Sequence, residues 1–157
     1  MGCFHSLPAT TEDPPPPISH PSAKQQGVSW VGGRQQVTLE DFSPLVDNHV
    51  TWIVQTPFGW QQDYDSPELL LKTEGAYWGE TDTGLEQTTE FAQGLGIQTL
   101  LKPHIWLTDA THGKWRTEIE MSSEQDWQTW FANYRQFILH YATFAESHGI
   151  PILCIGT

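Results

Sequence analysis

The segment Lys102-Pro103-His104-Ile105-Trp106 carries the side chains best suited to chemistry in this chain. It directly follows the apolar run 97–101, which is typical of a β-strand. Ligands of parallel α/β proteins bind just beyond the carboxyl ends of the strands. We therefore expect Lys102 and His104 to donate hydrogen bonds to a ligand and Trp106 to form a stacking wall. The alternative is that His104 is a structural histidine bonded to neighbouring backbone. Its position after a strand favours the binding role.

Two further segments combine aromatic rings with polar groups. Trp78 and Glu80 precede a predicted helix, and Trp60 follows a predicted strand. A flat indole beside hydrogen-bonding groups suits a sugar ring, whose C–H groups stack while its hydroxyls form hydrogen bonds. The alternative is that Glu80 is a solvated loop charge and that tryptophans fill core volume, as we expect for Trp127 and Trp130. The candidate substrate-binding residues are Trp60, Trp78, Glu80, Lys102, His104 and Trp106.

Other catalytic or cofactor chemistry has little support in the sequence. Glu118 and Glu120 alternate, so they either share a face as paired carboxyls for acid/base work, form a solvated edge, or partner Arg116. The seven histidines lack the H-x-H or H-E-x-x-H spacing of zinc sites. Glycine-rich phosphate-binding motifs and a nucleophile elbow are also missing from the sequence. We expect neither a metal nor another cofactor.

Strand and helix patterns alternate from residue 27 onward. The apolar, β-branched runs that predict strands are 27–31, 50–55, 97–101 and 150–155. Helical periodicity covers 39–46, 84–95 and a long stretch that ends before Gly149. Ser122 and Ser123 are predicted to cap this long helix, and Ser122-x-x-Gln125 has capping-box form. The alternation predicts an α/β fold with a parallel sheet and right-handed crossovers.

The segments that carry the candidate residues are predicted to be long loops. Residues 56–83 and 102–121 show little regular pattern and are much longer than ordinary connections between a strand and a helix. Long loops at the carboxyl ends of strands are usually functional. The sequence therefore predicts that the functional residues lie on one face of the domain, at the carboxyl ends of its strands.

Composition excludes several classes of partner. The 157 residues include 7 basic and 19 acidic side chains, for a net charge of −12, and no stretch concentrates Lys or Arg. A nucleic acid or an anionic membrane surface is therefore not expected as a partner. No run of about 18 apolar residues occurs, so we expect no transmembrane segment.

The first part of the chain is predicted to be a tether. Residues 1–26 are rich in Pro, Ser and Thr and are expected to be disordered, whereas residues 27–157 form the folded domain. Met1-Gly2-Cys3 resembles the cleavage point of a bacterial lipoprotein signal, with Cys3 as the acylated residue. This reading predicts a lipid anchor at Cys3 and an extracytoplasmic location at the cell surface. Cys3 and Cys154 lie in contexts too different to predict a disulfide.

Six short blocks follow one another between residues 27 and 157. They are Val28-Ser29-Trp30-Val31-Gly32-Gly33, Thr56-Pro57-Phe58-Gly59-Trp60-Gln61, Trp78-Gly79-Glu80-Thr81-Asp82, Leu101-Lys102-Pro103-His104-Ile105-Trp106, Gly113-Lys114-Trp115-Arg116 and Cys154-Ile155-Gly156-Thr157. In this order they resemble the front half of the family 113 glycoside hydrolases, which are β-mannanase-like TIM barrels. The resemblance implies that the domain is the first four β/α units of a (β/α)8 TIM barrel, truncated after strand 4.

The resemblance also implies retaining hydrolysis by two glutamates, an acid/base after the fourth strand and a nucleophile after the seventh. The family's Ile-Gly-Thr-Glu motif matches Ile155-Gly156-Thr157, so both glutamates would lie beyond Thr157 and this chain would hold no catalytic residue. The expected function is a fragment of a retaining glycoside hydrolase acting on β-linked, mannan-type polysaccharide or oligosaccharide.

On this reading the chain alone is inactive and marginally stable, since a TIM barrel usually takes about 250 residues. The alternative is a non-catalytic carbohydrate-binding α/β domain that uses the same tryptophans.

Overall fold

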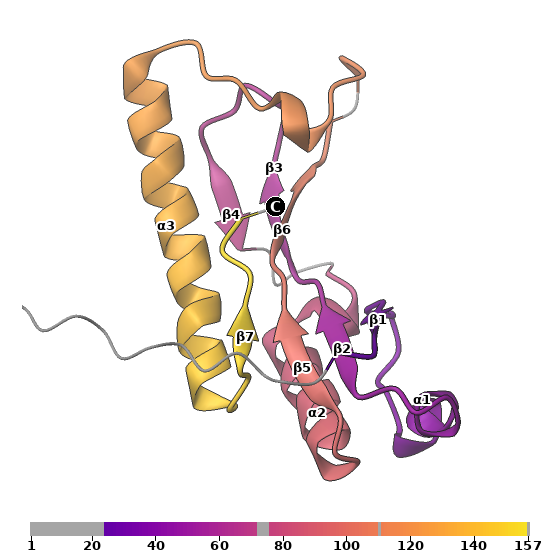
Figure 1. Cartoon of the computed structure of the whole chain (residues 1–157). Helices are drawn as coiled ribbons and strands as arrows, with labels where there is room; N and C mark the ends of the chain where they lie inside the picture. Colours follow the sequence, from indigo (N-terminus) through magenta and orange to yellow (C-terminus); the bar gives the residue numbers. More distant parts are fainter. Residues whose placement is uncertain (1–23, 72–75, 110, 157) are drawn as a thin grey trace, which may run out of the picture.

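The computed structural model of the chain describes residues 24–71, 76–109 and 111–156. Its first sheet has four parallel strands, in the spatial order β1 (Gly27–Trp30), β2 (Trp52–Gln55), β5 (Gln98–Leu101) and β7 (Ile152–Leu153). Figure 1 shows these strands side by side in the lower half of the molecule. The four strands lie within the four predicted runs, so the prediction of a parallel α/β sheet is confirmed.

The helices connect these strands and lie close to their predicted positions. The segment predicted as one helix over 39–46 is a 3-10 turn, η1 (Leu39–Phe42), followed by the short helix α1 (Ser43–Asp47). Helix α2 (Asp82–Gly94) begins where Thr81 accepts a hydrogen bond from the backbone N–H of Gly84. The long helix α3 spans Glu124–Ser147.

The capping residue of α3 is Ser123, one of the two serines predicted to cap this helix. Ser123, one residue later than the predicted Ser122-x-x-Gln125 pair, accepts a hydrogen bond from the backbone N–H of Asp126 at 3.1 Å. The Ser123 hydroxyl also donates to the Asp126 carboxylate at 2.6 Å. A capped N-terminus with an acidic residue in the first turn suits the helix dipole.

The prediction that residues 56–83 and 102–121 form loops of little regular structure is wrong. They contain a second sheet of three strands, in the order β4 (Leu69–Leu71), β3 (Phe58–Gln61) and β6 (His104–Leu107). Strand β3 pairs antiparallel with β4 and parallel with β6. Two short 3-10 turns, η2 (Trp78–Glu80) and η3 (Arg116–Glu118), complete these segments.

The second sheet continues the first in the same register. Trp52 pairs with Gln98 in the first sheet and Phe58 pairs with His104 in the second, an offset of 46 positions in both. Pro57 and Pro103 stand between the two sheets, and neither residue has an N–H to donate. The ladder nevertheless continues on both sides of them, through Lys102 N to Gln55 O and His104 N to Pro57 O, both at 2.9 Å. Each prolyl segment therefore extends a strand of the first sheet into the second.

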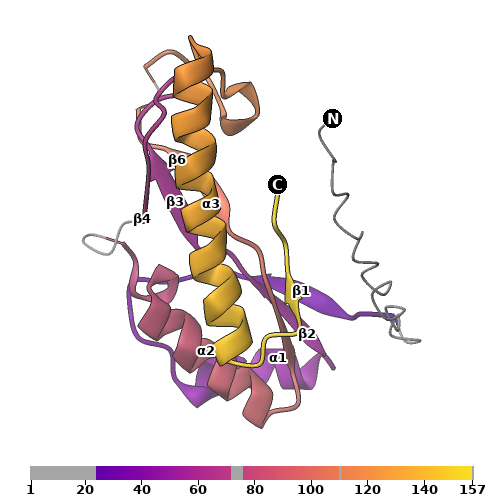
Figure 2. The same cartoon turned by 90° about the vertical axis from the view of Figure 1, so that its left-hand side faces the viewer.

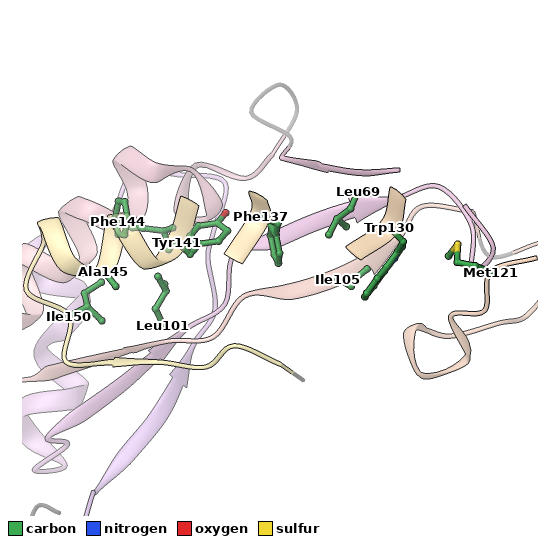
Figure 3. Packing of buried hydrophobic residues seen from close by; sticks show 11 residues of the cluster. Leu69, Leu101, Ile105, Met121, Trp130, Phe137, Tyr141, Phe144, Ala145 and Ile150 are labelled. Carbon is green, nitrogen blue, oxygen red and sulfur yellow. The ribbon is translucent and has the colours of Figure 1, made fainter. Parts of the chain in front are cut away.

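Helix α3 covers one face of the second sheet and also reaches the first. In Figures 1 and 2 it runs beside β4 and β3 at one end and beside β7 at the other. A single apolar cluster joins these elements, as Figure 3 shows. It includes Leu69, Leu101, Ile105, Trp130, Phe137, Tyr141 and Phe144. The prediction that Trp130 fills core volume is confirmed, and Trp127 packs partly buried against the same cluster.

The packing of α3 against β3 depends on the residue types at positions 59 and 61. A Cβ on Gly59 would lie 2.8 Å from the Phe137 ring, so the close approach of α3 to β3 requires glycine. Gln61 is fully buried, and its amide oxygen accepts a hydrogen bond of 2.9 Å from the indole N–H of Trp130. Its amide nitrogen donates to the Asp63 carbonyl at 2.7 Å. The hydrogen-bonding groups at both ends of this buried amide are therefore satisfied.

Three further predictions concern a membrane span, the N-terminal tether with Cys3, and Cys154. The described residues contain no helix long and apolar enough to span a membrane. Cys3, where a lipid anchor was predicted, and residues 1–23 of the predicted tether lie outside the residues that the structure describes. Cys154 is a free, half-buried thiol.

Candidate functional site

Aromatic side chains cover the face of the second sheet that points away from α3. Side chains alternate along a strand, and Gly59, Gln61 and Ile105 are buried on the side of α3. The remaining positions of β3 and β6 place Phe58 and Trp60 beside His104 and Trp106. Phe58 meets Trp106 edge to face with ring centroids 5.7 Å apart, and Trp60 lies 6.5 Å from Trp106.

The turn η2 closes this aromatic face into a cavity. Tyr77, which precedes η2, and Glu80 at its end line a cavity of about 290 Å³ together with Phe58, Trp60 and Trp106. We call this cavity, with its five lining residues, the aromatic cavity. The cavity lies beyond the carboxyl ends of β2 and β5, because β3 and β6 directly follow those strands. In parallel α/β proteins this is the end of the sheet where ligands bind.

Backbone contacts between Gly79 and the Gly32-Gly33 segment fix the position of η2. The backbone N–H of Gly79 donates to the carbonyl of Gly33 at 2.9 Å. A Cβ on Gly79 would lie 2.8 Å from the Cα of Gly32, so the two chain segments are in backbone contact. Arg34 also lies over the Tyr77 ring, 4.8 Å from its centroid, which supports that side of the aromatic cavity.

Glu80 is the carboxyl group among the five residues that line the aromatic cavity. Its partial burial raises the pKa of the side chain, and a hydrogen bond from the Tyr77 backbone opposes that rise. Desolvation favours the protonated form of a carboxyl group. Glu80 is therefore a polar group in an apolar setting, suited to exchanging hydrogen bonds with the hydroxyls of a bound ligand.

His104 adjoins the aromatic cavity, and its surroundings favour the neutral imidazole. Its ring meets Phe58 edge to face with centroids 6.0 Å apart. Partial burial lowers the pKa of His104, and the positive charges of Arg116 and Lys102 lower it further. The Nε2 atom is buried and has no hydrogen-bond partner in the described part of the chain. A neutral imidazole has one donor and one acceptor nitrogen, and the Nε2 of His104 is shielded from solvent.

The six predicted site residues occupy three kinds of position. Trp60, Glu80 and Trp106 line the aromatic cavity together. His104 packs against its wall, and Lys102 lies half-buried near enough to act on the His104 pKa. Trp78 does not line the cavity. Its carbonyl accepts a hydrogen bond of 2.6 Å from the Thr81 hydroxyl.

Three aromatic residues at this site were not among the predicted site residues. Phe58 and Tyr77 line the aromatic cavity, and Trp115 meets Trp106 edge to face with centroids 5.8 Å apart. The two-residue spacing of Phe58 and Trp60 is the period of a strand and is visible in the sequence. Whether Tyr77 or its neighbour Trp78 faces the cavity depends on η2, which the sequence pattern does not reveal.

The carboxyl pair Glu118 and Glu120 is not part of the aromatic cavity. Glu118 accepts hydrogen bonds from the Lys114 ammonium at 3.1 Å and from the Trp115 backbone at 2.9 Å. The expected partner, Arg116, instead lies over the Trp115 ring at 5.0 Å. Among the described residues, no group of three or more His, Cys, Asp or Glu side chains is arranged to hold a metal ion.

Together, these observations define an α/β protein with an aromatic-walled cavity at the carboxyl end of a parallel sheet. The chain belongs to Glycoside Hydrolase Family 113, whose family model matches residues 28–157. No curated protein matches the chain.

Solved structures share this fold. One is the GH113 beta-mannanase AaManA from Alicyclobacillus acidocaldarius in complex with ManMIm, with a TM-score of 0.70 and 23% sequence identity. The similarity covers 84% of this chain and 44% of that one. A structure of a GH113 beta-1,4-mannanase is similar with a TM-score of 0.66 and 21% identity, over 84% of this chain and 45% of that one. This chain thus spans less than half the length of these enzymes.

Proposed function

We propose that this chain supplies part of the substrate cleft of a retaining glycoside hydrolase acting on β-linked, mannan-type polysaccharide or oligosaccharide. The observation that carries the proposal is the aromatic cavity, where two tryptophans and a half-buried carboxyl group line one hollow beyond the strand ends. Membership of a glycoside hydrolase family supports the reaction class. The mannanases of similar fold support the choice of sugar.

In this proposal different residues bind different parts of the sugar. Trp60 and Trp106 stack on the C–H faces of a sugar, while Glu80 and His104 exchange hydrogen bonds with its hydroxyls. Burial, Arg116 and Lys102 together lower the pKa of His104, and Lys102, as the sequence predicts, also donates to the ligand. Trp78 stays a candidate for a neighbouring part of the cleft.

The arrangement corresponds to part of a TIM barrel. The four strands of the first sheet would be the first four strands of a (β/α)8 barrel, with α2 and α3 as two of its outer helices. The second sheet would extend the second and third strands above the barrel rim. The similarity to less than half of each mannanase is consistent with this reading.

We infer that this chain alone binds its substrate without cleaving it. Retaining hydrolysis requires two carboxyl groups about 5 to 5.5 Å apart. Among the described residues that line the aromatic cavity, Glu80 is the single carboxyl group, so they do not supply such a pair there. A non-catalytic carbohydrate-binding domain would show the same feature, and the family match favours the hydrolase.

Affinity electrophoresis tests both parts of the proposal. The full chain is run through native gels containing soluble β-mannan or dextran, and reducing sugar is measured after incubation with the mannan. We expect retardation by β-mannan alone and no release of sugar. Absence of retardation would contradict the substrate class. Release of sugar that Glu80→Gln abolishes would contradict the inference that this chain lacks a catalytic pair.

A further inference from the structure

A separate hollow lies on the side of the second sheet that faces α3. It measures about 370 Å³ and is bordered by the first half of α3, the segment around η3 and the chain after β7. Ile105, which points toward α3, is one of its lining residues. We call it the α3 hollow. Among the described residues, the α3 hollow and the aromatic cavity share no lining residue, so the two are distinct.

Four aromatic side chains of α3 form one wall of the α3 hollow. Trp127 stacks on Phe131 with ring centroids 5.7 Å apart, and Trp130 stacks on Tyr134 at 5.0 Å. Phe131 is 59% exposed, and Ile155, which also lines the hollow, is 68% exposed. Contact of water with such large apolar side chains is unfavourable, so a ligand that covers them gains free energy.

Arg116 is the one charged side chain among the described residues that line the α3 hollow. Its guanidinium lies over the Trp115 ring, 5.0 Å from the centroid, which favours this position. Within residues 24–71, 76–109 and 111–156, Arg116 has no ion-pair partner. The chain carries 19 acidic and 7 basic side chains, so carboxylates are not scarce. An unpaired guanidinium suits a carboxylate ligand, which it can bind through two parallel hydrogen bonds.

These features select an amphipathic ligand with one negative charge. The aromatic wall favours a flat ring, because aromatic pairs gain from stacked and edge-to-face contacts. The charge of Arg116 disfavours a cation, and the apolar surroundings disfavour a ligand with several charges. A volume of about 370 Å³ lies within the range of small-molecule sites, roughly 300–1,000 Å³.

We propose that the α3 hollow binds a small aromatic monocarboxylic acid, with its ring against Trp127 and Phe131 and its carboxylate on Arg116. This site is separate from the aromatic cavity, so the inference goes beyond the proposed function and does not depend on it. A ligand there contacts α3, the segment around η3 and the chain after β7 together. Binding therefore stabilises the folded state against unfolding.

Calorimetric titration of the full chain with naphthoate tests this site. Two comparison ligands separate its parts: naphthamide has the ring without the charge, and acetate has the charge without the ring. The test variants are Arg116→Gln and Phe131→Ala. Arg34→Gln is the matched control, because Arg34 is an exposed arginine beside the aromatic cavity. Circular dichroism and urea unfolding establish that each variant is folded.

We expect the unaltered chain to bind naphthoate about tenfold more tightly than naphthamide, and acetate to leave bound naphthoate in place at equal concentration. Arg116→Gln should remove the difference between the two ring ligands, while Phe131→Ala should weaken both. Equal affinities of the unaltered chain for naphthoate and naphthamide, or a difference that survives Arg116→Gln, would overturn the site. An equal loss in Arg34→Gln would place the ligand at the aromatic cavity and would overturn it as well.

Discussion

Trp60 and Trp106 lie directly opposite each other in the parallel pairing of β3 and β6, with their ring centroids 6.5 Å apart. Backbone hydrogen bonds on either side of the pair fix this spacing, through His104 N to Pro57 O and Thr108 N to Gln61 O. Both rings line the aromatic cavity, and Trp106 is 40% exposed. The sheet thus holds the two indoles at a fixed distance before a ligand binds. Binding therefore loses little side-chain conformational entropy.

Removing either indole should weaken sugar binding. For Trp60→Ala or Trp106→Ala we expect a loss of about 2 kcal/mol of binding free energy, a range typical of buried aromatic anchors. Fluorescence or calorimetric titration with a β-linked manno-oligosaccharide measures the change. Phe131→Ala is the control, because Phe131 is a 59% exposed aromatic residue of α3, on the other side of the sheet. An equal loss in the control would contradict the assignment.

A methyl group at residue 79 should disturb the wall of the aromatic cavity. In Gly79→Ala the new Cβ would lie 2.8 Å from Gly32 Cα and 2.9 Å from Gly33 N, both rigid backbone atoms. We expect a loss of about 1–3 kcal/mol in the free energy of unfolding, measured by urea denaturation.

The matched control for that change is Gly94→Ala at the end of α2. A Cβ there meets nothing within 4 Å. Because alanine is the better helix former, we expect a gain of about 0.5–1 kcal/mol. A Gly79→Ala protein as stable as the unaltered chain would show that η2 is free to move away from Gly32.

The buried amide of Gln61 should be important for stability. Gln61→Leu removes the acceptor of the Trp130 indole N–H and leaves that donor buried without a partner. A buried unsatisfied donor costs about 1–3 kcal/mol. Gln128→Leu, the same change on the exposed face of α3, should stay within about 0.5 kcal/mol of the unaltered chain. Equal unfolding midpoints for the two variants would contradict the role of this hydrogen bond.

His104 should make the protein less stable in acid. Its pKa in the folded state lies below the ordinary value of 6.5 because of burial and because of the charges of Arg116 and Lys102. Between its folded pKa and about 6.5 the unfolded chain binds more protons, so stability rises with pH across that window. His104→Asn should flatten the slope there. A His104 titration midpoint above 6.5 by NMR would contradict this account.

The sequence predicted the first sheet because its strands are apolar runs bounded by glycine and proline. The second sheet was missed for a physical reason. Pro57 and Pro103 each end a run and lack an N–H, which is typical of a loop. The pairing that carries the strands past these prolines joins residues 46 positions apart, and such a register is not readable from one chain.

The candidate site was predictable only in part. Trp60 and Trp106 stand just after predicted strands, so their place at the carboxyl end of the sheet was readable from the sequence, and both line the aromatic cavity. Their role in binding stays a prediction. The choice between Tyr77 and Trp78 depends on the backbone contact of Gly79 with Gly32, a tertiary feature. Likewise, Glu118 binds Lys114 because the turn η3 brings those two side chains together.

The central claim is that the aromatic cavity binds a β-linked, mannan-type chain. The most direct test follows the indole N–H resonances of the full chain by NMR during titration with a manno-hexasaccharide. We predict saturable shifts for Trp60 and Trp106, while Trp130, whose N–H is bonded to Gln61 in the core, stays unchanged. Saturation that leaves Trp60 and Trp106 unmoved, or no saturable shift at any concentration, would contradict the claim.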